Sequence, residues 1–122
     1  MDSTVEQFAS AKQIILESYK KNGTPMQTLV GVVVDNGTVY VRTGMKTWKA
    51  RRIKMNPRVR IDPSSMRMPP GKPAGTWVEG EAHFVTDVEV SSRMQRLFKK
   101  KYGLVGRIIE FFYRLRAYPK NN

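Results

Sequence analysis

Two β-branched runs on either side of an Asp35-Asn36-Gly37 turn constrain the fold of this chain more than any other feature of the sequence. Thr28 to Val34 precedes the turn, and Thr38 to Thr43 follows it. Asn-Gly readily adopts the positive φ angles that a two-residue hairpin loop needs, and β-branched side chains favour strands. The sequence therefore predicts a β-hairpin over residues 26–43.

Both strands of this hairpin are apolar on both faces for much of their length, with valines at positions 30, 32, 33, 34, 39 and 41. A single small barrel core covers only one face of a sheet. We therefore expect the other face to meet a second subunit, which predicts a homodimer.

The N-terminal stretch has the pattern of an amphipathic helix. Ser3 followed by Glu6 is typical of a capping box, and apolar residues then recur at helical spacing as far as Tyr19. Asn22-Gly23 is a stop signal. These features predict a helix that ends before the hairpin.

Beyond the hairpin, strand and helix patterns alternate. The further elements predicted are a short helix from Thr47 to Met55, a strand around Val59 and Ile61, a loop over 62–75, a strand from Thr76 to Val85, a helix capped at Thr86 that ends at Gly103, and a helix from Leu104 to Leu115. We therefore predict one domain over residues 1–122, mainly β with flanking helices.

The composition excludes several classes of site. The chain has no cysteine and one histidine, His83, so disulfides, thiolate metal sites and histidine-rich metal sites are excluded. The N-terminus has no basic and apolar signal pattern, and no run approaches the ~20 apolar residues of a membrane span. We expect a soluble cytoplasmic protein. We interpret His83 as a surface or interface residue because it has no evident catalytic partner.

The charge of the chain is strongly positive, with 22 Lys and Arg against 10 Asp and Glu, a net charge of +12. Such a field attracts nucleic acid, acidic membrane surfaces or phosphate-bearing cofactors. The densest part runs from Lys46 to Arg60, with seven cations and no acid. Cations in the first turns of a helix capped at Thr47 would repel the helix N-terminus unless an anion lies among them. The candidate anion ligands are Lys46, Thr47, Trp48, Lys49, Arg51 and Arg52. A solvated basic face is the alternative interpretation.

An ordered set of short motifs extends over roughly residues 5–102. The set comprises Gly23-Thr24-Pro25-Met26, the hairpin, Tyr40-Val41-Arg42-Thr43, Thr47-Trp48-Lys49, Asn56-Pro57-Arg58-Val59 and Val78-Glu79-Gly80-Glu81-Ala82. In order and spacing this set resembles the pyridoxamine 5'-phosphate oxidase-like split β-barrel flavoproteins. It is most similar to the branch that uses the deazaflavin coenzyme F420 rather than FMN.

The resemblance implies a split β-barrel homodimer with two cofactors between its subunits. It places Arg42 and Thr43 near the isoalloxazine ring and the ribityl chain, and Thr28 against the ring. It assigns phosphate binding to Thr47 and Lys49, with a backbone donor from Trp48. Such charge-assisted hydrogen bonds are the strong class.

The chain also departs from the pattern of the pyridoxamine phosphate oxidases. Gln27 and Val32 stand where those enzymes have an arginine and a lysine, and the arginine-rich C-terminal substrate motif is missing. These departures argue against vitamin B6 oxidation. The final strand of the family is not evident in the sequence, so either that strand is short or the barrel closes differently.

The leading functional hypothesis is an oxidoreductase that binds coenzyme F420 or FMN and transfers hydride to or from a small organic substrate; a cofactor carrier is a milder version. The alternative is a basic nucleic-acid-binding protein, against which the scarcity of aromatics in the basic segment argues. The arginines at 107, 114 and 116 also permit an interfacial membrane helix in the last predicted helix.

Overall fold

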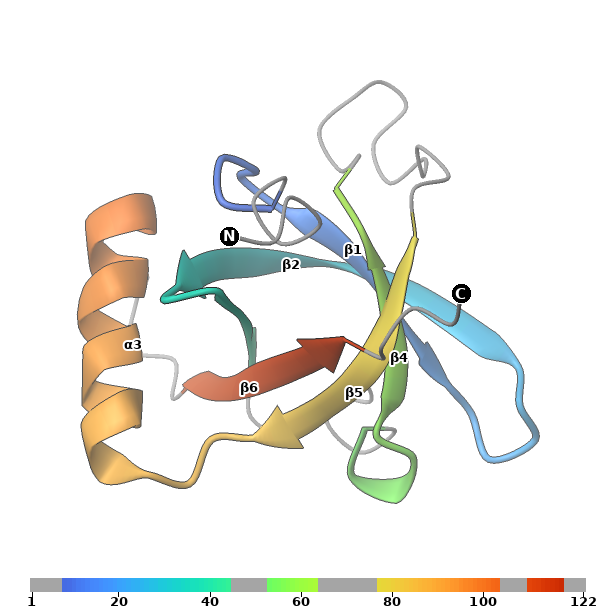
Figure 1. Cartoon of the computed structure of the whole chain (residues 1–122). Coiled ribbons are helices and arrows are strands. Elements are labelled where there is room, and N and C mark those ends of the chain that lie inside the picture. The colour runs from blue at the N-terminus through green and yellow to red at the C-terminus, as the bar shows by residue number, and fades with distance from the viewer. Residues whose placement is uncertain (1–7, 45–52, 64–76, 104–109, 118–122) are drawn as a thin grey trace.

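The computed structural model describes residues 8–44, 53–63, 77–103 and 110–117. They form a closed barrel whose strands neighbour one another in the order β1-β2-β3-β6-β5-β4, and every strand pair is antiparallel (Figure 1). The elements are β1 (Ile14–Tyr19), β2 (Pro25–Asp35), β3 (Thr38–Gly44), β4 (Arg58–Asp62), β5 (Val78–Phe84), α3 (Val88–Tyr102) and β6 (Glu110–Ala117). This architecture confirms the prediction of a mainly β split barrel with a helix outside it.

The β2–β3 hairpin forms where the sequence predicted it. Asp35 pairs with Thr38, and the two residues between them have positive φ angles, 51° at Asn36 and 78° at Gly37. Positive φ at both central positions is the type I′ geometry that matches the twist of the strands. The local chemistry of Asn-Gly therefore sets the register of the hairpin.

The barrel core takes alternate residues from every strand. Ile14, Leu16, Val30, Val32, Val39, Val41, Val59, Ile61, Ala82 and Tyr113 are all at most 5% exposed and pack together. Ile53 joins them from the short helical stretch over 53–55 that precedes β4. Burial of these side chains is the main driving force for closing the barrel.

Helix α3 lies beside the C-terminal end of β2, outside the barrel (Figure 1). Its buried residues Met94 and Phe98 pack with Val33 and Tyr40 on the outer face of the hairpin. The cap is Asp87, whose side chain accepts hydrogen bonds from the backbone of Glu89 and Val90, one residue later than the predicted cap at Thr86. The helix ends at Gly103 as predicted. Because α3 covers this face, the apolar pattern of the hairpin does not by itself require a second subunit.

The first correction concerns residues 14–19, which form strand β1 and not the end of a helix. β1 pairs with β2 on one side and β4 on the other, and five consecutive residues are buried. Burial on both faces removes the alternation that would have identified a strand. Asn22-Gly23 still forms the turn after it, with Gly23 at a φ of 88°. The predicted cap at Ser3 lies outside the described residues.

The second correction concerns residues 110–115, which were predicted to be helical. Glu110–Ala117 is strand β6, which pairs with β3 and β5 and closes the barrel. The final strand is therefore present, and an interfacial helix through this part of the chain is wrong. Residues 104–109 lie outside the described part of the chain. The predicted strands around 59–61 and over 76–85 are confirmed as β4 and β5.

Candidate functional site

Of the predicted cofactor site, the structure describes Thr28 in β2 and the C-terminal end of β3. Arg42 lies opposite Gly31 of β2 and Phe112 of β6, and Thr43 follows it opposite Phe111. Val41, the preceding residue, is fully buried in the barrel core. Alternation along the strand therefore puts the Arg42 side chain on the outer face.

Two aromatic rings of α3 hold the Arg42 guanidinium there. Its Cζ atom lies 4.7 Å from the centroid of the Tyr102 ring and 5.3 Å from that of Phe98. The two rings are themselves stacked, with centroids 5.8 Å apart and an interplanar angle of 17°. Attraction between a guanidinium and an aromatic face restricts the arginine to few rotamers. The end of β3 thus presents a positive charge of defined position.

Thr28 is placed differently from Arg42. It lies directly opposite Leu16, a core residue of β1, and so shares the face of the sheet that points into the barrel. Arg42 is on the outer face. The structure therefore does not bring Thr28 and Arg42 together on one surface of the sheet.

The remaining predicted ligands, Lys46, Thr47, Trp48, Lys49, Arg51 and Arg52, lie outside the described residues. Both ends of their segment are fixed, however. β3 is hydrogen-bonded on both sides, and Ile53 is 3% exposed in the barrel core. The Asn56 side chain accepts a hydrogen bond from the Arg58 backbone at 3.2 Å and so defines the turn into β4.

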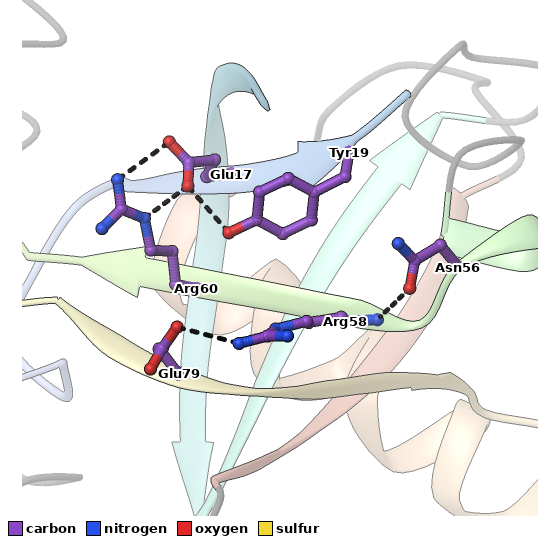
Figure 2. A network of polar contacts seen from close by, with 6 residues as sticks. All are labelled: Glu17, Tyr19, Asn56, Arg58, Arg60 and Glu79. Atoms are coloured by element: carbon purple, nitrogen blue, oxygen red, sulfur yellow. Dashed lines mark hydrogen bonds and ion pairs between the residues drawn. The ribbon is translucent and has the colours of Figure 1, made fainter. Parts of the chain in front are cut away.

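A polar network on the outer face of β1 and β4 was not predicted from the sequence (Figure 2). Glu17 is 2% exposed, and its carboxylate accepts hydrogen bonds from both Nε and Nη2 of Arg60. The Gln27 amide and the Tyr19 hydroxyl each donate to it at 2.9 Å. The Arg60 guanidinium also lies 4.1 Å from the centroid of the Trp77 ring. The carboxylate is thus neutralised and saturated with donors.

These contacts determine the ionisation of the network. Burial raises the pKa of Glu17, but the hydrogen bonds from Arg60, Gln27 and Tyr19 outweigh burial and hold that pKa below its ordinary value. Burial and the neighbouring carboxylate raise the pKa of Tyr19. Glu17 is therefore a structural group that is charged at neutral pH and a poor proton donor. The sequence analysis missed the role of Glu17 because it predicted a helix over residues 14–19. Only in a strand does alternation place Glu17 on the face opposite to the neighbouring core residue Leu16.

The exposed edge of the same face carries weaker contacts. Arg58 and Glu79 form an ion pair at 3.5 Å with both side chains more than half exposed. His83 Nε2 lies 3.1 Å from the Glu81 carboxylate, and the His83 side chain is also more than half exposed. The location of His83 agrees with its interpretation as a surface residue. Across the described ranges, no group of three or more His, Cys, Asp or Glu side chains could hold a metal ion.

Comparison with known proteins identifies the family to which the chain belongs. The family model described as pyridoxamine 5'-phosphate oxidase matches residues 1–115. The chain belongs to this family. No curated protein matches the sequence. In the part of the chain that the structure describes, no helix is long and apolar enough to cross a membrane.

Solved structures resemble this family member in fold at low sequence identity. A candidate pyridoxamine 5'-phosphate oxidase from Listeria innocua has a TM-score of 0.68 at 16% identity, with 94% of this chain and 88% of that chain covered. HutZ, the heme storage protein of Vibrio cholerae, has a TM-score of 0.69 at 15% identity, with 94% of this chain and 87% of that chain covered. General stress protein 26 of Bacillus anthracis has 0.64 at 15% identity, with 93% and 86% covered. At these identities the likeness establishes the fold alone.

Proposed function

We propose that the chain binds a phosphate-bearing flavin or deazaflavin at the end of β3, through Arg42, Thr43 and the basic segment from Lys46 to Arg52. The observation that carries the proposal is the position of Arg42, which is held by aromatic stacking where β3 leads into that segment. The lysines and arginines from Lys46 to Arg52, a stretch that contains no acid, fit the chemistry of a phosphate. Membership of the pyridoxamine 5'-phosphate oxidase family supports the same assignment.

The proposed activity is oxidoreduction, in which the cofactor supplies hydride chemistry to a small organic substrate. The part of the protein is to bind and orient the cofactor, and no proton-transfer residue is assigned. Glu17 is excluded from such a role by its saturated hydrogen bonding. A carrier that binds the cofactor without turning over a substrate is the milder version of the same proposal.

We propose coenzyme F420 in preference to FMN. FMN presents one phosphate, whereas coenzyme F420 adds the carboxylates of its glutamate tail. Lys46, Lys49, Arg51, Arg52 and Lys54 are more cations than one phosphate needs, and an extended basic track suits a longer anionic tail. The family resemblance in the segment from Thr47 to Arg52 supports the same choice. We also propose a homodimer, on the resemblance alone.

Titration of the purified protein with FMN, coenzyme F420 and haem at matched ionic strength tests the assignment. We expect tighter binding of coenzyme F420 than of FMN, with affinity that falls as salt rises. Binding of FMN without coenzyme F420 would refute the choice between them, and binding of neither would refute the site. Haem binding alone would favour haem storage, the role of HutZ. A steep salt slope for DNA binding without cofactor binding would favour a nucleic-acid partner.

Two lysine variants separate a specific phosphate contact from the diffuse field. Lys49→Ala should weaken cofactor binding about tenfold to a hundredfold, because a charge-assisted contact is worth ~1.5–3 kcal/mol. Lys120→Ala removes the same charge near the C-terminus and should change affinity little. Equal effects of the two substitutions would mean that only the net charge matters. Sedimentation at micromolar concentration tests the dimer, which a monomer would refute.

A further inference from the structure

Arg42 rests on a support that is itself fixed to the barrel. Tyr102, whose ring lies under the guanidinium, accepts a hydrogen bond from the Val32 backbone N–H through its hydroxyl at 2.8 Å. The same hydroxyl donates to the Lys12 carbonyl at 2.6 Å or the Val32 carbonyl at 3.0 Å. Burial raises the pKa of Tyr102, which keeps the hydroxyl protonated and able to donate.

These bonds fill a gap in the sheet. β1 begins at Ile14, opposite Val30, so the backbone of Val32 faces a position beyond the start of that strand. Tyr102 satisfies backbone groups of Val32 and Lys12 there. The adjacent Lys101 ammonium donates to the carbonyls of Ala11 and Val32, each at 2.7 Å. The last turn of α3 is therefore held to the barrel by side-chain bonds to backbone atoms, and the ring of Tyr102 cannot shift without breaking them.

Gly31 provides the space in which the guanidinium and the ring meet. It lies directly opposite Arg42 in the β2–β3 pair. A Cβ atom at this position would come within 3.1 Å of Arg42 Nε and 3.5 Å of Tyr102 Cζ. A side chain larger than hydrogen would therefore push the guanidinium away from its place between strand and ring.

We infer that Tyr102 is a positioning residue for the cofactor contact of Arg42: its ring, anchored through its hydroxyl to β2, fixes the Arg42 guanidinium near the end of β3. The inference rests on the proposed function of Arg42. Tyr102 does not touch the cofactor and acts through Arg42. An arginine already confined to one place loses less conformational freedom when it binds the cofactor, so the ring raises affinity.

A double-mutant cycle tests this role. Tyr102→Phe keeps the ring and removes the hydroxyl, whereas Tyr102→Leu removes both. With Arg42 present, we expect Tyr102→Leu to bind coenzyme F420 and FMN about threefold to fivefold more weakly than Tyr102→Phe does. In the Arg42→Gln background the two Tyr102 variants should bind equally, because the ring has no guanidinium to hold.

A purely structural role would lower the melting temperature of both Tyr102 variants without this dependence on Arg42. Cofactor binding with no coupling between the two positions would therefore overturn the inference and leave the proposed function standing. A second measurement does not need the cofactor. The Arg42 Nε–H proton signal, assigned by its loss in Arg42→Gln, should show a larger ring-current shift in the wild type and in Tyr102→Phe than in Tyr102→Leu, where the Phe98 ring alone remains beside the guanidinium.

If no variant and no wild-type protein binds either cofactor, the proposed function fails, and the ring-current shift alone decides whether Tyr102 holds Arg42. An Arg42 signal that is the same in the wild type and in Tyr102→Leu would refute the positioning role in that case as well.

Discussion

Replacement of Glu17 by glutamine should destabilise the protein more than replacement of any other described acid that forms an ion pair. Glu17 is 2% exposed and accepts four hydrogen bonds, two of them from Arg60. In Glu17→Gln the charge is lost, and an amide donor replaces one acceptor oxygen among groups that all donate. Breaking a fully buried ion pair by removal of one partner costs about 3–5 kcal/mol.

The cost at this site should be smaller than that limit. The Arg60 side chain is 33% exposed and Gln27 is at the surface, so both can regain hydrogen bonds to water after the substitution. We therefore expect Glu17→Gln to lower the free energy of unfolding by about 2–3 kcal/mol at neutral pH. Glu79→Gln is the matched control. Its ion pair with Arg58 is more than half exposed on both sides, so its loss should cost less than about 0.5 kcal/mol.

The difference should depend on pH with a defined sign. The pKa of Glu17 is lower in the folded protein than its ordinary value of 4.5. The stabilisation by the carboxylate is thus present in full above that ordinary value and is lost as the pH falls through the lower folded pKa. The gap between wild type and Glu17→Gln should therefore narrow between pH 5 and pH 3.

Urea unfolding followed by far-ultraviolet circular dichroism measures these free energies without adding salt. A gap that is equal at pH 7 and pH 3 would show that the charge of Glu17 does not contribute. A Glu17→Gln variant no less stable than Glu79→Gln would refute the view that burial makes the network strong.

The remaining predictions concern local features, each measured as the change in the free energy of urea unfolding. Asp87→Ala should cost about 1 kcal/mol because Asp87 caps α3, whereas Thr86→Ala should cost less than half of that. The reverse order of the two costs would show that Thr86 is the cap, as the sequence predicted. Gly37→Ala should cost about 1 kcal/mol from its φ of 78° alone, because no atom lies within 4 Å of a new Cβ, and an unchanged stability would refute the strain. Arg93→Gln breaks a bidentate pair with Asp35 in which the Arg93 side chain is 56% exposed, and it should cost no more than about 1 kcal/mol; a larger loss would show that solvent does not weaken this pair.

The sequence predicted those elements whose signals are local. Asn36-Gly37 specifies its own turn. The alternation of apolar and polar residues over 58–61 and 78–83 indicates strands without reference to any distant segment. The amphipathic stripe of α3 and its glycine stop are local as well. The two mistaken helices, by contrast, are strands whose pairing partners decide their conformation.

β1 and β6 show why those two strands were missed. Each is hydrogen-bonded on both sides, β1 to β2 and β4, β6 to β3 and β5. β6 pairs Leu115 with Val39, a residue more than seventy positions earlier. Long-range pairing of this kind overrides intrinsic preference. In β6, Tyr113 and Leu115 alternate with Arg114 and Arg116, which is a strand pattern, but the apolar residues before it were fitted to a helix instead. The apolar spacing of Ile15, Leu16 and Tyr19 fits a helix by coincidence.

Only part of the candidate site could be predicted, because the rest also depends on contacts between distant residues. The strand pattern was sufficient to place Arg42 and Thr43 at the end of the hairpin, and β3 ends there. Arg42 stacks on Phe98 and Tyr102, which lie more than fifty positions later in the chain. Helical periodicity could predict only that these two aromatic residues lie on the packed face of a helix. The inward-facing register of Thr28 likewise depends on β1, which the sequence did not reveal.

The distribution of the acids explains why a net charge of +12 becomes a localised field. Within the described residues, Glu17, Glu79 and Asp35 neutralise Arg60, Arg58 and Arg93, respectively. No acid occurs between Asp35 and Asp62, the stretch that contains β3 and the basic segment after it. Acids that are engaged by arginines of the barrel wall and of α3 cannot also screen that segment. The segment after β3 is therefore rich in cations and free of acids in sequence, and Glu110, opposite Gly44, is the acid that the strand register places at the end of β3.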